Sequence, residues 1–320
     1  MSNATFLDFG TVGPGDIDPQ PLDDVLPGIE VFDATTEDEL PARLAGREFV
    51  LMNKVRLGPA EMDAAGRLRF IGLTATGTDN VDLDAARERG IAVCNIRDYC
   101  TQSVAQHALA LMLTLTQQLV GYRHQAMSGA WGASGQFCML DYPVRELSGC
   151  RLGIIGWGNL GRATARFAEA IGMTIMVAQR PGSAGPAPEG RVALDTLLAE
   201  ADIISLHCPL TADTHHLIGA RELELMRDDA LLINTARGAL VDTAALADAL
   251  RAGGIGGAGI DVLEQEPPVD GDPLIGLEES NLIVTPHVAW AAREARQRGI
   301  AQTADCVRAF LAGELLNRVD

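Results

Sequence analysis

One glycine-rich segment constrains the fold of this 320-residue chain more than any other feature. In LGIIGWGNLGRATARFAEAIGMTIMVAQR, residues 152–180, Gly156, Gly158 and Gly161 form the spacing G-x-G-x-x-G. An apolar run precedes the glycines, and an Ala-rich stretch and a second apolar run follow them. In a strand–turn–helix–strand unit, such glycines permit a tight turn, a close approach to a pyrophosphate and close packing of helix on strand. The segment therefore predicts a dinucleotide-binding unit; the alternative is a glycine turn that serves packing alone.

The residue that usually selects the dinucleotide is replaced in this chain. An Asp or Glu about 20 residues after the glycines would bind the ribose hydroxyls of NAD, but Gln179 stands there, followed by Arg180. A neutral amide does not repel a 2′-phosphate, and a guanidinium can pair with one through two parallel hydrogen bonds. The pair favours NADP over NAD. The alternative is that Arg180 is a solvated loop residue and that Gln179 binds an unphosphorylated ribose.

The alternation of apolar runs with helix-like stretches predicts an α/β protein with two doubly wound domains, one of Rossmann type and one flavodoxin-like, with a cleft between them. Three strand candidates precede the glycine segment, in residues 46–55, 68–81 and 90–96. Six more are predicted in residues 151–156, 174–179, 202–208, 230–236, 257–262 and 282–287. The Pro-, Gly- and Asp-rich opening of the chain is predicted to be loop.

Long helical patterns mark the predicted domain boundaries. Residues 103–127 read as one helix, apolar in its first half and expected to be buried against another domain or a second subunit, and residues 129–149 read as a connecting arm. A helix predicted in residues 291–316 returns to the first domain. We therefore expect a discontinuous substrate domain of residues 1–102 and 291–320, and a dinucleotide domain of residues 103–290 that includes the helix and the arm.

Charge and cysteine usage exclude several classes of partner. The formal net charge is −18 and no run of Lys or Arg interrupts it, so nucleic acid and anionic membranes are not expected partners. The six cysteines form no C-x-x-C pair, which predicts free thiols in a reducing cytoplasm. The opening residues lack the pattern of a signal or transit peptide, and the longest apolar stretch, residues 108–115, is too short to span a bilayer.

Three polar residues follow three of the late strand candidates. Arg237 offers a planar fork suited to a carboxylate, His287 offers an imidazole of the kind that often acts as a general acid or base, and Glu266 could hold and charge that imidazole. Because strand ends converge in a doubly wound sheet, this set predicts hydride-transfer chemistry. The alternatives are a structural ion pair for Arg237, Glu264 as the true partner of the histidine, and a capped core histidine.

Several motifs in order resemble the family of D-isomer-specific 2-hydroxyacid dehydrogenases, over nearly the whole chain from about Leu51. They are LTATGTDNVDLDAARERGIAV, SVAQHALALML, ELSGCRLGIIGWGNLGR, ISLHCPLTADTHHLI, INTARGALVDTAAL and GIDVLEQEPP with NLIVTPHVAW. SVAQH, the segment from Trp131 to Cys138 and TPHVAW are most similar to the hydroxypyruvate reductase or glycerate dehydrogenase branch.

The resemblance implies a homodimeric, NAD(P)-dependent enzyme that reduces a small 2-oxo acid such as hydroxypyruvate or glyoxylate. Arg237 would bind the substrate carboxylate and carbonyl, His287 would donate the proton, and Glu266 would orient the imidazole. Backbone amides of Thr76 and Gly77 would hold the other side of the carboxylate. The further cofactor contacts implied are Asn159 and Leu160 at the pyrophosphate, Cys208 and Pro209 at the adenosine, and Thr235, Ala236 and Asp261 at the nicotinamide.

Other candidate residues have two readings. Lys54 follows a strand, so it either attracts an anionic substrate or is merely solvated, and Trp290 either shapes a substrate pocket or packs on the last helix. His207, His215 and His216 do not assemble a ligand set, since the adjacent pair should diverge on any regular element. No metal is therefore expected.

Two other functions fit the same fold. A formate- or phosphonate-oxidising dehydrogenase is one, although a formate-oxidising relative would be expected to carry Gln where Glu266 stands. A dinucleotide-sensing scaffold or corepressor is the other, and it would be expected to carry long interaction tails, which the short termini do not show.

Overall fold

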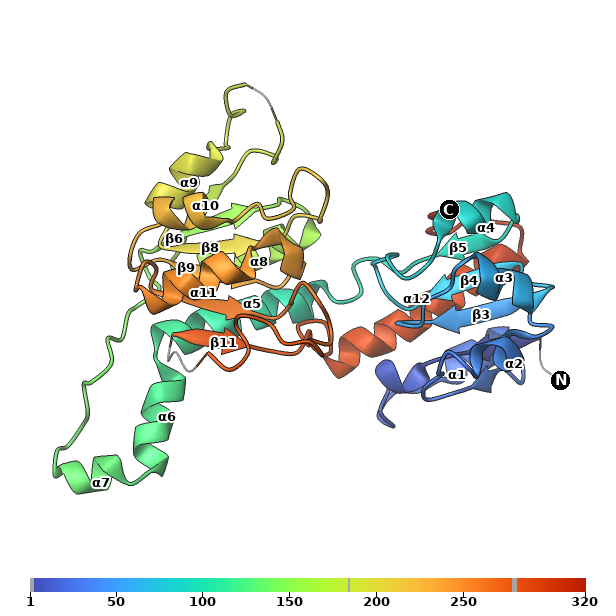
Figure 1. The fold of residues 1–320 in the computed structure, drawn as a ribbon, viewed down its shortest axis with the longest axis horizontal. Coiled ribbons are helices and arrows are strands. Elements are labelled where there is room, and N and C mark those ends of the chain that lie inside the picture. Colours follow the sequence, from blue (N-terminus) through green and yellow to red (C-terminus); the bar gives the residue numbers. More distant parts are fainter. Residues whose placement is uncertain (1–2, 184, 278–280) are drawn as a thin grey trace. The chain divides into compact units, whose positions relative to one another are not determined.

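The computed structural model describes residues 3–183, 185–277 and 281–320 (Figure 1). The chain divides into two compact units, one made of Met1–Cys100 with Trp290–Asp320 and the other of Thr101–Ala289. Each unit contains its own parallel sheet, and helices lie between most of the successive strands. This arrangement confirms the predicted α/β class.

The first unit contains a five-stranded parallel sheet in the order β2-β1-β3-β4-β5, which is the flavodoxin-like order. Its strands are β1 (Ala4–Phe6), β2 (Glu30–Val31), β3 (Phe49–Met52), β4 (Phe70–Leu73) and β5 (Ala92–Cys94). Its helices are η1 (Phe9–Thr11), α1 (Gln20–Val25), α2 (Leu40–Leu44), α3 (Pro59–Ala65), α4 (Leu83–Glu88) and α12 (Arg293–Leu311). One face of the sheet packs on α1 and α12, and the other on α2, α3 and α4.

The prediction that the chain opens with a loop is wrong. β1 lies between β2 and β3, with Thr5 opposite Val50, and the side chains of Ala4 and Phe6 are fully buried. A strand of three residues that is buried on both faces shows no alternation of polar and apolar positions. Only pairing with β3 identifies it.

The second unit contains the six predicted strands, all parallel, in the order β11-β10-β9-β8-β6-β7. They are β6 (Arg151–Ile155), β7 (Thr174–Val177), β8 (Ile203–Leu206), β9 (Leu231–Asn234), β10 (Gly257–Ile260) and β11 (Leu282–Val284). From β6 the chain adds β7 on one side, and then returns to add β8 and the later strands on the other side. Ligands of doubly wound sheets bind beyond the strand ends at such a switch point, here between β6 and β8.

Helices cover both faces of this sheet (Figure 1). One face packs on α5 (Thr101–Thr116) and α8 (Asn159–Ala170). The other packs on α9 (Leu194–Glu200), α10 (Ala220–Leu225) and α11 (Thr243–Arg251), and the short helix η2 (Gly238–Leu240) precedes α11. Asp242 caps α11 by accepting hydrogen bonds from the N–H groups of Ala244 and Ala245.

The helix predicted for residues 103–127 is two helices. α5 ends at Thr116 and α6 (Leu119–Met127) follows, because Gln118 adopts a left-handed conformation with φ of 53° that no helix can continue through. The Thr116 hydroxyl donates back to the Met112 carbonyl at 2.8 Å, in the last turn of α5. α7 (Ala130–Ser134) lies in the predicted arm. None of the helices in the described ranges is both long and apolar enough to cross a lipid bilayer.

Candidate active site

The glycine turn joins β6 to α8, and its three glycines have different surroundings. A Cβ on Gly156, whose φ is 104°, would lie 2.4 Å from the backbone nitrogen of Cys208, and one on Gly161 would lie 2.1 Å from the Gly156 carbonyl oxygen. At Gly158, the residue that caps α8, a Cβ would meet nothing within 4 Å. Packing therefore requires glycine at positions 156 and 161. At Gly158 the missing side chain leaves open space beside the N–H groups that begin α8. This cradle fits a pyrophosphate.

The residues predicted to recognise the ribose follow β7. The Gln179 N–H donates to the Val192 carbonyl at 2.8 Å, and its side chain is half-buried. Arg180 is exposed, and within the described ranges its guanidinium has no hydrogen-bond or ion-pair partner. A guanidinium in this position has all its donors available to an anion.

Cys208 and Pro209 follow β8, next to the glycine turn. Burial raises the pKa of the Cys208 thiol to about 11, so the thiol is neutral at physiological pH. The preceding His207 is also buried, which lowers its pKa to about 4, and its Nε2 lies 2.9 Å from the Ser205 hydroxyl. Both groups are uncharged beside the cradle, and neither is placed to act as a base at neutral pH.

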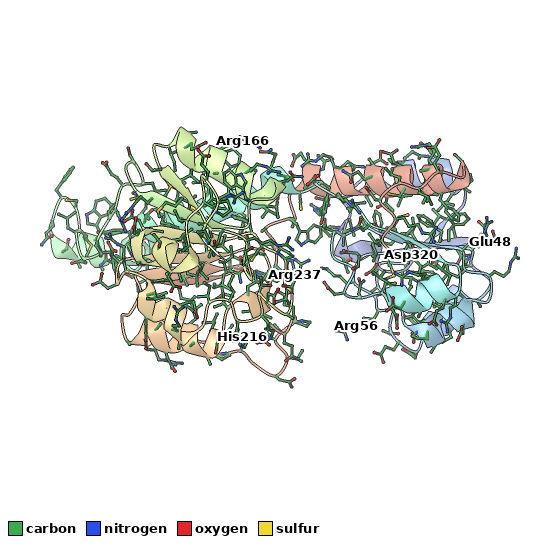
Figure 2. The ribbon with its side chains drawn as sticks, turned by 90° about the horizontal axis from the view of Figure 1, so that it is seen from above. Glu48, Arg56, Arg166, His216, Arg237 and Asp320 are labelled. Carbon is green, nitrogen blue, oxygen red and sulfur yellow. The ribbon has the colours of Figure 1, made fainter. Side chains whose placement is uncertain are left out.

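Arg237 stands in a turn after β9 that a buried amide holds. Asn234, the last residue of β9, donates from Nδ2 to the Arg237 carbonyl at 2.8 Å and accepts from the Ala236 N–H at 3.0 Å. The Arg237 guanidinium donates to the Ala236 carbonyl at 2.8 Å, and its other donors have no partner within the described part of the chain. Figure 2 marks Arg237 in this unit. Thr235 carries a buried hydroxyl that also has no hydrogen-bond partner among the described residues, which fits a polar ligand group beside this turn.

The turn of Arg237 packs directly on the loop that follows β10. A Cβ on Gly238 would lie 1.9 Å from the carbonyl carbon of Leu263, so only glycine permits this contact. The N–H of Leu263 in turn donates to Glu266 Oε1 at 2.8 Å. The backbone of Leu263 therefore links the turn of Arg237, which it contacts at Gly238, to the Glu266 side chain, to which it donates a hydrogen bond.

Glu266 pairs with His287, which follows β11. His287 Nδ1 lies 2.6 Å from Glu266 Oε2, and the two side chains are 30% and 33% exposed. The His287 backbone is left-handed, with φ of 55°, and its N–H donates to the Asp261 carbonyl at 2.7 Å. Glu264, the alternative partner, faces His215 and His216 instead.

Asp261 braces the segment that carries His287, a role that the sequence analysis missed. Its carboxylate is wholly buried and accepts from the Thr285 hydroxyl, from Val288 N–H at 2.9 Å and from Ala289 N–H at 2.8 Å. His107 Nε2 lies 3.1 Å from the same Thr285 hydroxyl. No motif in the sequence joins α5 to this turn. The contact of Asp261 with a nicotinamide stays a prediction.

The residues predicted on the substrate side belong to the other unit. The Asp8 carboxylate accepts from the backbone N–H groups of Asn53, Lys54 and Val55, at 2.6–3.1 Å, and so fixes the loop of Lys54 after β3. Thr76 and Gly77 lie just after β4. No hydrogen bond in the described ranges uses their two backbone N–H groups.

Trp290 also belongs to this unit. Its ring lies 6.5 Å from that of Tyr99, which places it in an aromatic contact.

Comparisons with known proteins agree with this geometry. Residues 109–289 match the model of the D-isomer specific 2-hydroxyacid dehydrogenase NAD binding domain. The chain is 46% identical to a glycerate dehydrogenase of Methylorubrum extorquens over 285 residues, 89% of each chain, and 36% identical to a hydroxypyruvate reductase of Blautia hydrogenotrophica over 98% of each chain. The crystal structure of TT0316 protein from Thermus thermophilus superposes with a TM-score of 0.86 at 35% identity, covering 99% of both chains. The chain therefore belongs to the D-isomer specific 2-hydroxyacid dehydrogenases, oxidoreductases with a nicotinamide dinucleotide cofactor.

Proposed function

We propose that this enzyme reduces hydroxypyruvate or glyoxylate to the corresponding 2-hydroxy acid. The observation that carries the proposal is the His287–Glu266 pair, linked through Leu263 and Gly238 to the turn of Arg237. The set lies on the loops after β9, β10 and β11, in the unit that holds the glycine cradle. The similarity to a glycerate dehydrogenase and to a hydroxypyruvate reductase supports this substrate class.

His287 is the proposed proton donor. Glu266 accepts the hydrogen bond of Nδ1, which fixes the orientation of the ring and leaves Nε2 as the nitrogen on its other side. Nε2 is then the nitrogen that passes its proton to the substrate oxygen as the carbonyl carbon is reduced. The bound dinucleotide supplies the hydride.

Arg237 is the proposed carboxylate anchor. Its guanidinium carries five N–H donors in a planar fork, of which the structure shows one used by the Ala236 carbonyl. A fork binds a carboxylate through two parallel bonds and fixes the orientation of the adjoining carbonyl. Because Asn234 and Gly238 hold the backbone on both sides, the substrate would meet an anchor that is already in position.

The proposed cofactor is NADP in preference to NAD. Gln179 puts no negative charge at the end of β7, and the neighbouring Arg180 guanidinium, which pairs with none of the described residues, suits a 2′-phosphate. The pyrophosphate would lie on the N-terminus of α8, at Asn159 and Leu160. Thr235, Ala236 and Asp261 are the proposed nicotinamide contacts, with Cys208 and Pro209 at the adenosine.

We assign residues 1–102 and 291–320 to substrate binding and residues 103–290 to the dinucleotide. In the first part, Lys54 and the amides of Thr76 and Gly77 are the proposed second set of carboxylate contacts. The buried free thiols, among them Cys94, support a reducing compartment, the cytoplasm.

We also propose a homodimer formed through α6 and the arm of residues 129–149 that follows it. Large apolar side chains are exposed there, with Phe137 95%, Leu140 83% and Met127 75% exposed. A patch of this kind is typical of a protein interface, and the apolar arm suits a second copy of the chain. Light scattering should give twice the chain mass, and Phe137→Asp with Leu140→Asp should reduce it to the monomer.

The experiment that tests the function compares initial rates of hydroxypyruvate and glyoxylate reduction with NADPH and with NADH at equal concentration. Turnover that is faster with NADPH would support both the substrate class and the cofactor preference. Turnover that is faster with NADH would keep the substrate class and remove the preference. Absence of turnover with every combination would contradict the substrate class.

A further inference from the structure

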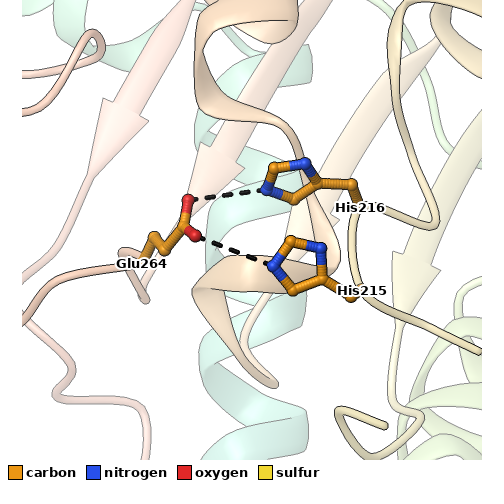
Figure 3. Close-up of side chains that lie close together, drawn as sticks. All are labelled: His215, His216 and Glu264. Atoms are coloured by element: carbon orange, nitrogen blue, oxygen red, sulfur yellow. Dashed lines mark ion pairs between the residues drawn. The ribbon is translucent and has the colours of Figure 1, made fainter. Parts of the chain in front are cut away.

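A cluster of two histidines and a carboxylate lies outside the candidate active site (Figure 3). His215 and His216 are adjacent in the loop before α10, and Glu264 comes from the loop after β10. His215 Nε2 lies 3.8 Å from Glu264 Oε1, and His216 Nε2 lies 3.5 Å from Glu264 Oε2. Both imidazoles therefore turn the same nitrogen to one carboxylate.

The expectation that these neighbouring imidazoles diverge is wrong. His216 adopts the left-handed conformation, with φ of 49°, so the pair lies on no regular element. The two rings stack with centroids 4.1 Å apart and an interplanar angle of 30°. The His216 N–H donates to the Ala239 carbonyl at 2.8 Å, which holds this backbone in place.

One imidazole nitrogen of the cluster is buried and has no hydrogen-bond partner among the described residues. This atom is His216 Nε2, although the Glu264 carboxylate is nearby. A buried polar atom of this kind in a folded protein calls for a partner that the protein itself does not supply. A metal ion between the three side chains would provide it.

We propose that His215, His216 and Glu264 bind a divalent transition-metal ion of the Zn²⁺ type. Two imidazole nitrogens and one carboxylate oxygen are ligands that Zn²⁺ prefers, and a water would complete four-coordination. Metal–ligand bonds of about 2.0–2.2 Å place tetrahedral ligand atoms about 3.3–3.6 Å apart. The three ligand atoms already lie within 4.8 Å of one another. His215 and Glu264 are about half exposed, so their side chains can make the small approach that remains.

A bound ion would cross-link segments that are distant in the sequence. His216 is tied to Ala239 in η2, whose first residue, Gly238, packs on Leu263. Glu264 is the next residue, two positions before Glu266. The ion would thus immobilise the loop after β10 and stabilise the fold, because it binds the native chain and finds no preformed site in the unfolded one.

The test is isothermal titration of the chelator-treated full-length protein with ZnCl₂, without dinucleotide or substrate. We expect one Zn²⁺ per chain and at least about tenfold weaker binding in His215→Ala and in Glu264→Gln, since even the loss of an outer-shell partner costs about that much. His216→Asn is the third variant, because Asn tolerates the left-handed backbone at this position. At the same Zn²⁺ concentration, the thermal midpoint of the wild type should rise more than that of Glu264→Gln.

Two matched controls identify where the ion binds. His124→Ala removes an exposed histidine on α6, and Cys138→Ser removes the exposed thiol, the most plausible competing ligand outside the cluster. Both should bind one Zn²⁺ as the wild type does. The proposal is overturned if the wild type binds no Zn²⁺, if Glu264→Gln and His215→Ala bind as tightly as the wild type, or if Cys138→Ser abolishes binding. Because no turnover is measured, these outcomes do not depend on the proposed reduction.

Discussion

Glu266→Gln is the most informative change to the candidate active site, because the variant keeps the shape of the side chain and removes one acceptor. Glu266 accepts hydrogen bonds from Leu263 N–H at 2.8 Å and from His287 Nδ1 at 2.6 Å. An amide has one oxygen and one NH₂ group. If its oxygen keeps the Leu263 bond, its NH₂ faces Nδ1, and His287 must lose the proton there.

The expected loss of kcat/KM follows from the hydrogen bond between Glu266 and His287 that the substitution removes. A hydrogen bond to a charged group contributes about 1.5–3 kcal/mol. Because the side chains are 30% and 33% exposed, the lower part of that range applies, about 1.5–2 kcal/mol. At about 1.4 kcal/mol per decade, kcat/KM should fall about 10- to 30-fold.

The assay is kcat/KM for hydroxypyruvate at saturating NADPH from pH 5.5 to 8.5, together with dinucleotide affinity by fluorescence. We expect the rate to fall while the dinucleotide affinity stays the same. Glu224→Gln, on the exposed face of α10, is the matched control and should react as the wild type does. A Glu266→Gln enzyme with wild-type kcat/KM across this pH range would refute the proposed role of the pair.

Three further predictions concern other parts of the site. Arg237→Lys should lower kcat/KM about 10-fold or more, mainly through KM, since a single ammonium cannot form two parallel bonds to a carboxylate; steady-state kinetics with an unchanged KM would argue against the anchor. Gln179→Asp should lower the NADPH to NADH rate ratio about 10-fold by repelling the 2′-phosphate, and an unchanged ratio would remove the cofactor argument. His207 is buried with a pKa of about 4, against about 6.5 in the unfolded chain, so the unfolded state binds more protons between these values. Urea unfolding should therefore show ~3 kcal/mol of stability lost from pH 6.5 to pH 4, and a His207→Gln variant with an equally steep loss would contradict this assignment.

The glycine turn and the six strands of the second unit could be predicted because their signals are local. Gly156, Gly158 and Gly161 lie within six residues, and each apolar run identifies a strand without reference to its partners. β1 lacked such a signal. Its three residues gain their burial from β2 and β3, which lie 24 or more residues away.

The pairings between loops could not be predicted in the same way. The sequence favoured Glu266 as the partner of His287 and left Glu264 as the alternative, and only the path of the loop after β10 directs Glu266 to His287 and Glu264 to the two neighbouring histidines. That path depends on Gly238 packing against Leu263, a contact between residues 25 positions apart.

The family, the order of the elements and the residue types at the strand ends could all be inferred from the amino-acid sequence, because periodicity and turn chemistry act over a few residues. Which of those side chains meet depends on the folded arrangement of the loops. The tertiary structure also revealed the buried supports, Asn234 beneath the turn of Arg237 and Asp261 beneath that of His287. Their partners are fixed by strand order and by backbone conformation in the loops, which depend on packing across the whole unit and not on any one segment.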